Sequence, residues 1–316
     1  MRNRSIAPAF FFSGLSVCAS CLCFAGQTQQ TKQKPLTRVF TVEAEERYQV
    51  TATIRVETRG VTTEKIGEKT YAKPYTHNAE GQLSWRSTRK VTALKEDGSA
   101  AIFESLDQFR ANCDGTPESL NATSGLQKSV HDTCAEWQTL AQMNYEEEKF
   151  GLIRGLPIPA NVHNDDDSPL LDYWLRRAFR PSVILPKGPL NFGYQAAHKI
   201  TNPSGVASNP EGEEQVEWLE AASDVPAATL HVSQNLSWMD DPRKSGLSNV
   251  MAAPAKRQLF YADSLNTISL LDGSLLKATR SATRETKEVL DPVPGLPDAP
   301  TFSSKLTITV TMRRLP

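Results

Sequence analysis

Residues 40–57 read FTVEAEERYQVTATIRVE, and this stretch decides the fold class. Apolar side chains occupy every second position from Phe40 and again from Tyr48 to Val56, with Glu46 as the interruption. Neighbouring residues of a strand point to opposite faces, so the alternation predicts a long strand, or a bent pair of strands, with one buried face. Charged and hydroxyl residues fill the other positions and should meet water, as antiparallel sheets allow.

The same alternation recurs along the chain. Asp-Gly pairs at 97–98 and 272–273 separate alternating segments, and Asp-Gly suits the positive φ angles of a tight hairpin turn. Further alternation covers 228–238 and 306–312. We expect at least seven strands and a mainly β (α+β) fold: a large curved antiparallel sheet or half-barrel with one or two helices packed on it. The expected buried positions are Val50, Ile54, Leu230, Val232, Ile308 and Val310, and the expected solvent-facing positions include Arg55, Thr309 and His231.

The strongest helix signal covers residues 168–180. Ser168-Pro169 suits a helix start, and Pro181 ends the pattern. One stripe is apolar and the opposite face carries three arginines, so we expect the helix to pack on the sheet, with an interfacial helix on an anionic membrane as the alternative. The stripe predicts an apolar cleft lined by Leu171, Trp174, Leu175 and Phe179. A weaker helix signal covers about 126–142.

The N-terminus has the order of a secretory signal peptide. Arg2 and Arg4 precede an uncharged, largely apolar stretch over residues 5–25, and small residues follow at Ala25. We therefore expect a signal peptide at 1–25, a disordered polar leader at 26–38 and a single β-rich domain at 39–316. A retained anchor, or a lipid attached at Cys18 or Cys21, is the alternative. The expected location is secreted or periplasmic, with a lipid-anchored form as the lesser possibility.

Two cysteines remain after the expected cleavage, Cys113 and Cys134. Outside a reducing compartment they would most simply form one disulfide, which would stabilise the fold by roughly 3 kcal/mol through the closed loop. A pair of unbridged thiols is the alternative. His131 lies close to Cys134, but a metal site would need further ligands at standard spacing.

Charge and motifs narrow the function classes. Removing Arg2 and Arg4 from 35 basic residues leaves 33 against 36 acidic residues, so there is no basic field to attract nucleic acid. No later segment has the length and hydropathy of a transmembrane span. The familiar nucleotide, protease and calcium motifs are absent, and both S-x-x-K matches, at 87–90 and 274–277, fall in predicted strands, where positions three apart face opposite ways. We assign no catalytic residue, cofactor or metal.

Residues 185–194, LPKGPLNFGY, carry an LP-x-x-P-x-x-x-G pattern. In this and in its layout the chain resembles uncharacterised secreted or lipoprotein-like, β-rich envelope families of Gram-negative and acidobacterial type. Gly193-Tyr194-Gln195 stands where those families have Gly-Asp-x-Trp. The layout is also similar to the half-barrel of periplasmic lipoprotein carriers, which implies a curved sheet whose concave side is closed by a helix.

The sequence leads to a function hypothesis and two rivals. We expect a non-enzymatic envelope or extracellular protein that binds an apolar ligand, such as a lipid, or a protein partner. A secreted hydrolase with a site not yet located is the second hypothesis. The third is a structural assembly subunit that pairs through exposed strand edges.

Overall fold

A computed structural model describes residues 35–114, 141–156, 178–188, 193–201, 211–221, 223–240, 256–290 and 299–316. The chain divides into a short unit that ends at Gln33 and a large unit from Lys34 to Pro316, and only the large unit is treated below. Its strands are β1 (Glu45–Ile66), β2 (Lys69–Leu94), β3 (Ala100–Asp114), β4 (Gln142–Glu147), β5 (Ile153–Arg154), β6 (Gln195–Thr201), β7 (Glu211–Glu220), β8 (Ala227–Asp240), β9 (Lys256–Ser269), β10 (Leu275–Val289) and β11 (Thr301–Arg314).

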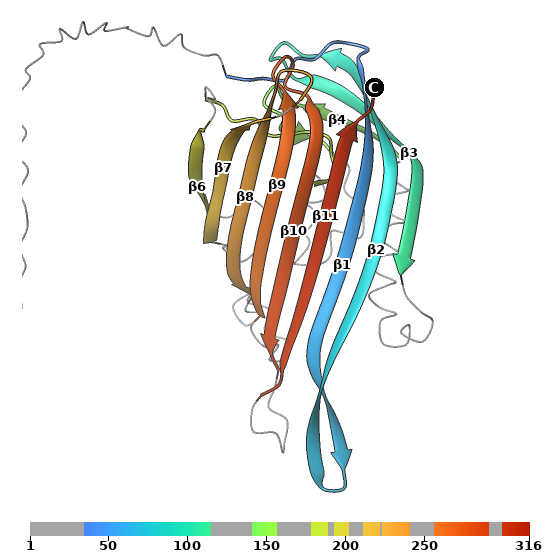
Figure 1. The fold of residues 1–316 in the computed structure, drawn as a ribbon, viewed down its shortest axis with the longest axis vertical. Coiled ribbons are helices and arrows are strands. Elements are labelled where there is room, and N and C mark those ends of the chain that lie inside the picture. The colour runs from blue at the N-terminus through green and yellow to red at the C-terminus, as the bar shows by residue number, and fades with distance from the viewer. Residues whose placement is uncertain are drawn as a thin grey trace, which may run out of the picture. The chain divides into compact units, whose positions relative to one another are not determined.

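These strands form one antiparallel sheet that does not close, in the order β5-β4-β3-β2-β1-β11-β10-β9-β8-β7-β6 (Figure 1). Nearly every strand therefore pairs with its neighbour in sequence. The exception lies at the middle, where β1 pairs with β11 from Tyr48↔Arg314 to Arg59↔Ser303. The predicted mainly β fold with a large antiparallel sheet is confirmed.

Side-chain alternation sorts the two faces as the sequence predicts. Val50, Ile54, Leu230, Ile308 and Val310 are buried on one face, which we call the inward face. Val232 also points inward but is half-buried. Of the expected solvent-facing positions, Arg55 is exposed, whereas Thr309 and His231 are half-buried on the second, outward face.

The first strand begins later than the sequence pattern suggests. Residues 40–44 lie outside β1, and Val42 is exposed rather than buried. Glu43 adopts a positive φ of 68° and its backbone N–H donates to the carbonyl of Val91, so the chain turns before entering the sheet. The apolar alternation over 40–44 therefore does not continue the strand.

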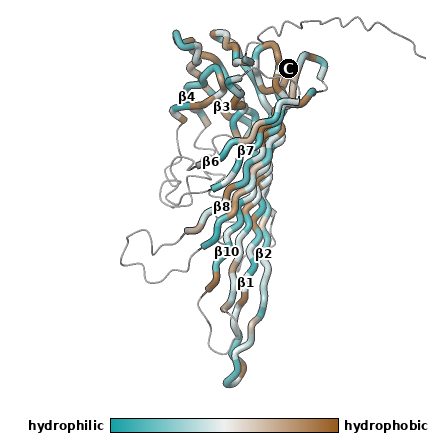
Figure 2. The backbone as a smooth tube through the Cα atoms, turned by 90° about the vertical axis from the view of Figure 1, so that its left-hand side faces the viewer, coloured by the Kyte–Doolittle hydropathy of each residue, from teal (hydrophilic) through white to brown (hydrophobic). Residues whose placement is uncertain are grey.

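The sheet bends where β2 meets β3. Between the pairs Ser84↔Arg110 and Arg86↔Asp107, β3 contains one more residue than β2, and Gln108 there has a positive φ of 53°. An extra residue of this kind makes a β-bulge, which increases local bending and twist. In Figure 2, β3 and β4 lie to one side of the plane formed by the long strands.

The predicted helices fall largely outside the described residues. Within the described part of 168–180, Ala178 alone has helical conformation. Most of 126–142, with Cys134, is likewise not described, so the disulfide to Cys113, which belongs to β3, stays a prediction. Among the residues that are described, no helix has the length and apolar character needed to span a membrane.

The register can be tested at two adjacent positions of β11. Ile308 is 5% exposed within the core, so Ile308→Ala should lower the free energy of unfolding by about 2–5 kcal/mol. Thr309 points to the outward face, and Thr309→Ala should cost far less. Urea denaturation of both variants measures the difference, and equal losses would contradict the assigned faces.

Candidate functional site

A non-strand segment, residues 178–188, packs on the inward face, and we call it the strap. Ala178, Phe179, Val183 and Leu185 belong to the same hydrophobic core as the central strands. Phe179 is 1% exposed and meets the ring of Trp85 in β2 edge to face, with centroids 5.6 Å apart. The strap therefore forms part of the core, although it carries no strand ladder of its own.

Two buried arginines from the sheet bind the strap's backbone carbonyls. Arg280 of β10 donates from Nη1 to the carbonyl of Arg180 and from Nη2 to that of Ser182, both at 2.8 Å. Arg89 of β2 donates from Nη1 to the intervening carbonyl of Pro181 at 3.0 Å. Three successive carbonyls of the strap thus accept hydrogen bonds from guanidinium groups that come from opposite sides of the β1–β11 pair.

The chemistry of these contacts explains why arginine occupies the two positions. A buried carbonyl without a partner costs about 1–3 kcal/mol, and an irregular segment cannot satisfy its carbonyls through a ladder. A guanidinium group offers five N–H donors in one plane, so it can reach two carbonyls and still anchor to the sheet. Arg280 does this through Nε, which donates to Oδ1 of Asn266 in β9 at 2.8 Å.

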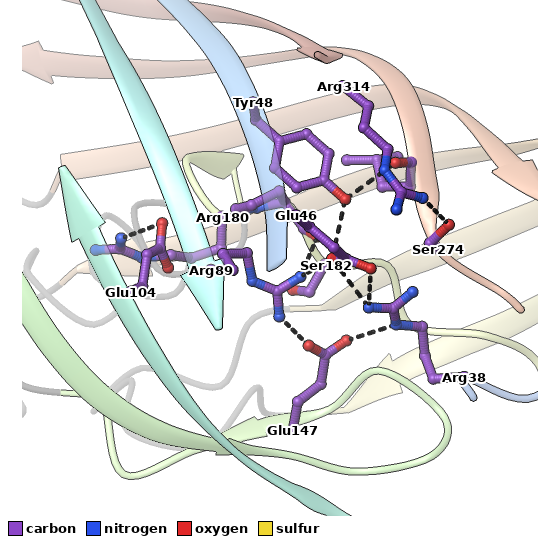
Figure 3. Close-up of polar contacts among 12 residues, drawn as sticks. Arg38, Glu46, Tyr48, Arg89, Glu104, Glu147, Arg180, Ser182, Ser274 and Arg314 are labelled. Atoms are coloured by element: carbon purple, nitrogen blue, oxygen red, sulfur yellow. Dashed lines mark hydrogen bonds and ion pairs between the residues drawn. The ribbon is translucent and has the colours of Figure 1, made fainter. Parts of the chain in front are cut away.

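Arg89 also belongs to a network of four charged side chains, of which three are buried and Glu46 is half-buried (Figure 3). Glu46 accepts from Arg38 at 2.9 Å and from Arg89 at 3.1 Å. Glu147 accepts from Arg89 and lies 3.4 Å from Nε of Arg38. Arg38 is at the end of the expected polar leader, yet only 7% of its surface is exposed. The network therefore connects the start of the described chain to β1, β2 and β4.

A third carboxylate, Glu104 of β3, completes the polar interior. It accepts hydrogen bonds from Ser87 at 2.6 Å and from the Tyr145 hydroxyl at 2.9 Å, and Arg180 of the strap lies 3.2 Å away. The Tyr145 hydroxyl in turn accepts from Nε of Arg89 at 2.8 Å. Three arginines and two glutamates are thus buried, with Glu46 half-buried beside them, and paired charges of this kind are tolerated inside proteins where isolated ones are not.

Burial and neighbouring charges in this network move the pKa values of its groups further from neutral pH. Burial alone would raise the pKa of Glu46, but Arg38 and Arg89 outweigh it and hold that pKa below its usual value of 4.5. Burial raises the pKa of the Tyr48 and Tyr145 hydroxyls. These three groups keep one protonation state around neutrality, which favours a structural role for them over proton transfer.

A cavity of about 430 Å³ lies between the strap and the inward face of β7–β10. Its apolar walls come from Ile184 and Leu185 of the strap, Leu230 and Val232 of β8, and Val216 of β7. Polar groups also reach it, namely Ser264, Asn266 and Arg280 in one group and His198, Glu214 and Gln234 in another. Arg280 thus both binds the strap and lines the cavity.

The structure brings together only part of the predicted apolar cleft. Phe179 belongs to the strap and is buried against the sheet but does not line the cavity, and Leu171, Trp174 and Leu175 lie outside the described residues. Sequence reasoning missed Arg89 and Arg280. Both stand in phase with buried residues of their strands, as in Ala278-x-Arg280-x-Ala282, and a charge at a core position is the signal that could have identified them.

The hydrogen bonds from Arg280 predict that removing its guanidinium group will loosen the strap. Arg280→Met should leave two strap carbonyls without donors and lower the free energy of unfolding by about 3 kcal/mol or more. The amide of Leu185, which donates to the carbonyl of Phe150, should exchange hydrogen faster. Hydrogen exchange with mass spectrometry measures this. The matched control is Lys277→Met, which alters the exposed outward face of the same strand, and equal effects would refute the role of Arg280.

The charge network predicts a pH dependence. The pKa of Glu46 is below 4.5 in the folded protein, so its stabilising contribution is fully present above pH 4.5 and is lost as pH falls through the folded pKa. Glu46→Gln should lower stability at pH 7 and flatten the decline between about pH 5 and 3. Urea denaturation at several pH values tests this, with the exposed Glu64→Gln as control. An unchanged decline in Glu46→Gln would count against the network.

Comparison of this chain with known proteins does not identify a family. No protein-family model and no curated protein matches the chain. Among solved structures, the InvG secretin of the Salmonella SPI-1 type III secretion injectisome is 10% identical with a TM-score of 0.14, over 89% of this chain and 65% of that one. Pseudomonas aeruginosa OccK7 (OpdD) is 9% identical with a TM-score of 0.14, over 88% of this chain and 100% of that one. Likenesses this weak carry no argument about fold or function.

Proposed function

We propose that the protein is a non-enzymatic binding protein of the cell envelope or extracellular space, and that it holds an apolar small molecule between the strap and the sheet. The observation that carries the proposal is the cavity of about 430 Å³. Its volume lies in the range of small-molecule sites, which are concave, mostly apolar and equipped with a few polar groups that orient the ligand.

The walls favour a ligand with an apolar body. Each aliphatic side chain that the ligand covers removes apolar surface from water, at about 25 cal/mol per Å². Leu230 is already fully buried, whereas Val232 is half-buried and offers surface to a ligand. Acyl chains and flat hydrophobic molecules satisfy this wall, so a lipid is the ligand class that the proposal names.

The polar groups would set the orientation of the ligand. Arg280 already donates hydrogen bonds to Asn266 and to strap carbonyls, so it has few donors left for a ligand head group. Glu214 accepts from Gln234 at 2.5 Å, and His198 is its cross-strand partner in β6. The His198 side is exposed, so the polar end of a bound molecule would lie there and its apolar end against Ile184 and Val232.

Fluorescence of N-phenyl-1-naphthylamine tests the cavity directly. The purified protein should enhance the probe's emission, and a fatty acid should displace it. Val232→Trp places a large ring in the cavity and should weaken probe binding by at least about tenfold, a loss of roughly 1.4 kcal/mol. Leu265→Trp, on the exposed outward face of β9, should bind like the parent.

Native mass spectrometry of freshly purified protein supplies the second measurement. A co-purified apolar molecule that is absent from Val232→Trp would support the proposal. If the folded parent shows neither a bound molecule nor probe enhancement, or if both tryptophan variants bind equally well, the proposal is wrong.

A further inference from the structure

The outward face carries a second concavity, which the proposed function does not use. It is a groove of about 640 Å³ over the outward side of β7, β8, β9 and β10, strands that lie side by side in Figure 1. The sheet separates it from the cavity under the strap. Most of the residues that line it are polar, and Tyr261 supplies the one aromatic ring among them.

The groove is built from two complete cross-strand rows. The first row runs Glu213, Asn235, Tyr261 and Thr283, and the second runs Gln215, Ser233, Asp263 and Ser281, with one residue from each of the four strands. All eight line the groove. Neighbouring strands are about 4.8 Å apart, so each row spans roughly 14 Å with a side chain at every step.

The one aromatic ring of the first row is open to solvent. Tyr261 is 41% exposed, and a ring held on a strand presents a flat apolar surface at little cost in conformational freedom. Planar polar side chains flank it. Glu213, Gln215 and Asn235 are exposed, and no side-chain hydrogen bond joins them to another described residue. Their amide and carboxylate groups therefore keep their donors and acceptors for a ligand.

Asp263 is held in place from outside the groove. His231 of β8 lies between two carboxylates, with Nε2 2.8 Å from Asp263 and Nδ1 3.1 Å from Glu217. One carboxylate oxygen of Asp263 is thereby occupied, and the other remains available. His231 therefore positions the carboxylate without entering the groove.

From this geometry we propose that the outward groove binds a chain of uncharged sugars, laid across strands β7–β10. A sugar ring has one apolar C–H face that can stack on Tyr261, and it has a rim of hydroxyl groups that both donate and accept. Paired donors and acceptors on Asn235, Gln215 and Glu213 match that rim. A stepwise row of side chains suits a polymer whose polar groups also repeat at steps of about a strand spacing.

Charge selects among the polymers that could lie there. Glu211, Glu213 and Asp263 line the groove, and no Lys or Arg does among the described residues. Sulfated or phosphorylated sugars would meet repulsion at close range. A basic peptide would form favourable ion pairs with the carboxylates, but its charges would not account for the exposed ring of Tyr261 or for the neutral amides of Gln215 and Asn235. The combination therefore favours the sugar chain.

The test is isothermal titration of the purified protein with cellohexaose, chitohexaose and maltohexaose, followed by heparin and a lysine hexapeptide. At least one of the three neutral or acetylated sugars should bind, and heparin should not. Tyr261→Ala should weaken that binding by at least about tenfold, through loss of the stacking surface. Leu265→Ala removes a similarly exposed apolar side chain of β9 that does not line the groove, and should bind like the parent.

Thermal unfolding shows that each variant is folded before its binding is compared. Asn235→Ala gives an independent reading, because it removes polar contacts and leaves the ring in place, and it should also weaken sugar binding. The proposal is overturned if no sugar binds, if Tyr261→Ala and Leu265→Ala bind sugar equally, or if the lysine peptide alone binds. The last outcome would make the groove a site for basic peptides.

Discussion

The interior of this protein depends on the guanidinium groups of two arginines. They donate the hydrogen bonds to the strap's carbonyls that a neighbouring strand would donate in a sheet. A sheet satisfies its own backbone, but a segment laid over its inward face does not, and the strap has buried carbonyls at 180, 181 and 182. Arg280 and Arg89 donate to them from two strands on either side of the β1–β11 pair. Burying these cations requires counter-charges, and Glu46, Glu147 and Glu104 supply them around Arg89 and Arg180. The cavity exists because the strap is held at this position.

The two faces of the sheet consequently present different chemistry. The inward face combines aliphatic walls with charged groups that pair with one another, and its cavity is the site proposed for an apolar molecule. The outward face has rows of hydroxyl, amide and carboxylate groups in register, with a single aromatic ring among them in the groove. Strand alternation produces both surfaces from the same four strands, because successive residues of β7–β10 point to opposite faces. A ligand on one face is separated from a ligand on the other by the thickness of a backbone.

Local pattern was enough to predict the sheet but not its interior chemistry. Alternation at Val50, Ile54, Ile308 and Val310, with Asp-Gly turns, predicted strands, faces and two hairpins, because these depend on neighbours in sequence. The pairing of Arg280 with residue 182 depends on contacts 98 residues apart, which no local period encodes. Glu46 looked like an interruption of the strand, although it is the carboxylate that holds Arg38 and Arg89. The outward groove needed the relative register of four strands, which turns and loops set and composition does not.

The central pairing of β1 with β11 has a consequence for how the sheet is made. Thr51 and Thr311 face each other across 260 residues, whereas most other pairs in the sheet join neighbours in sequence. Hairpins on either side can form early, since closing a short loop costs little entropy. The pairing of β1 with β11 joins the two halves. It forms only when two segments distant in sequence meet, and such non-local pairing is slow. Until then both halves expose a long unpaired edge at what will become the middle of the sheet, so the folding chain is most open to mispairing and aggregation where the finished molecule is best protected.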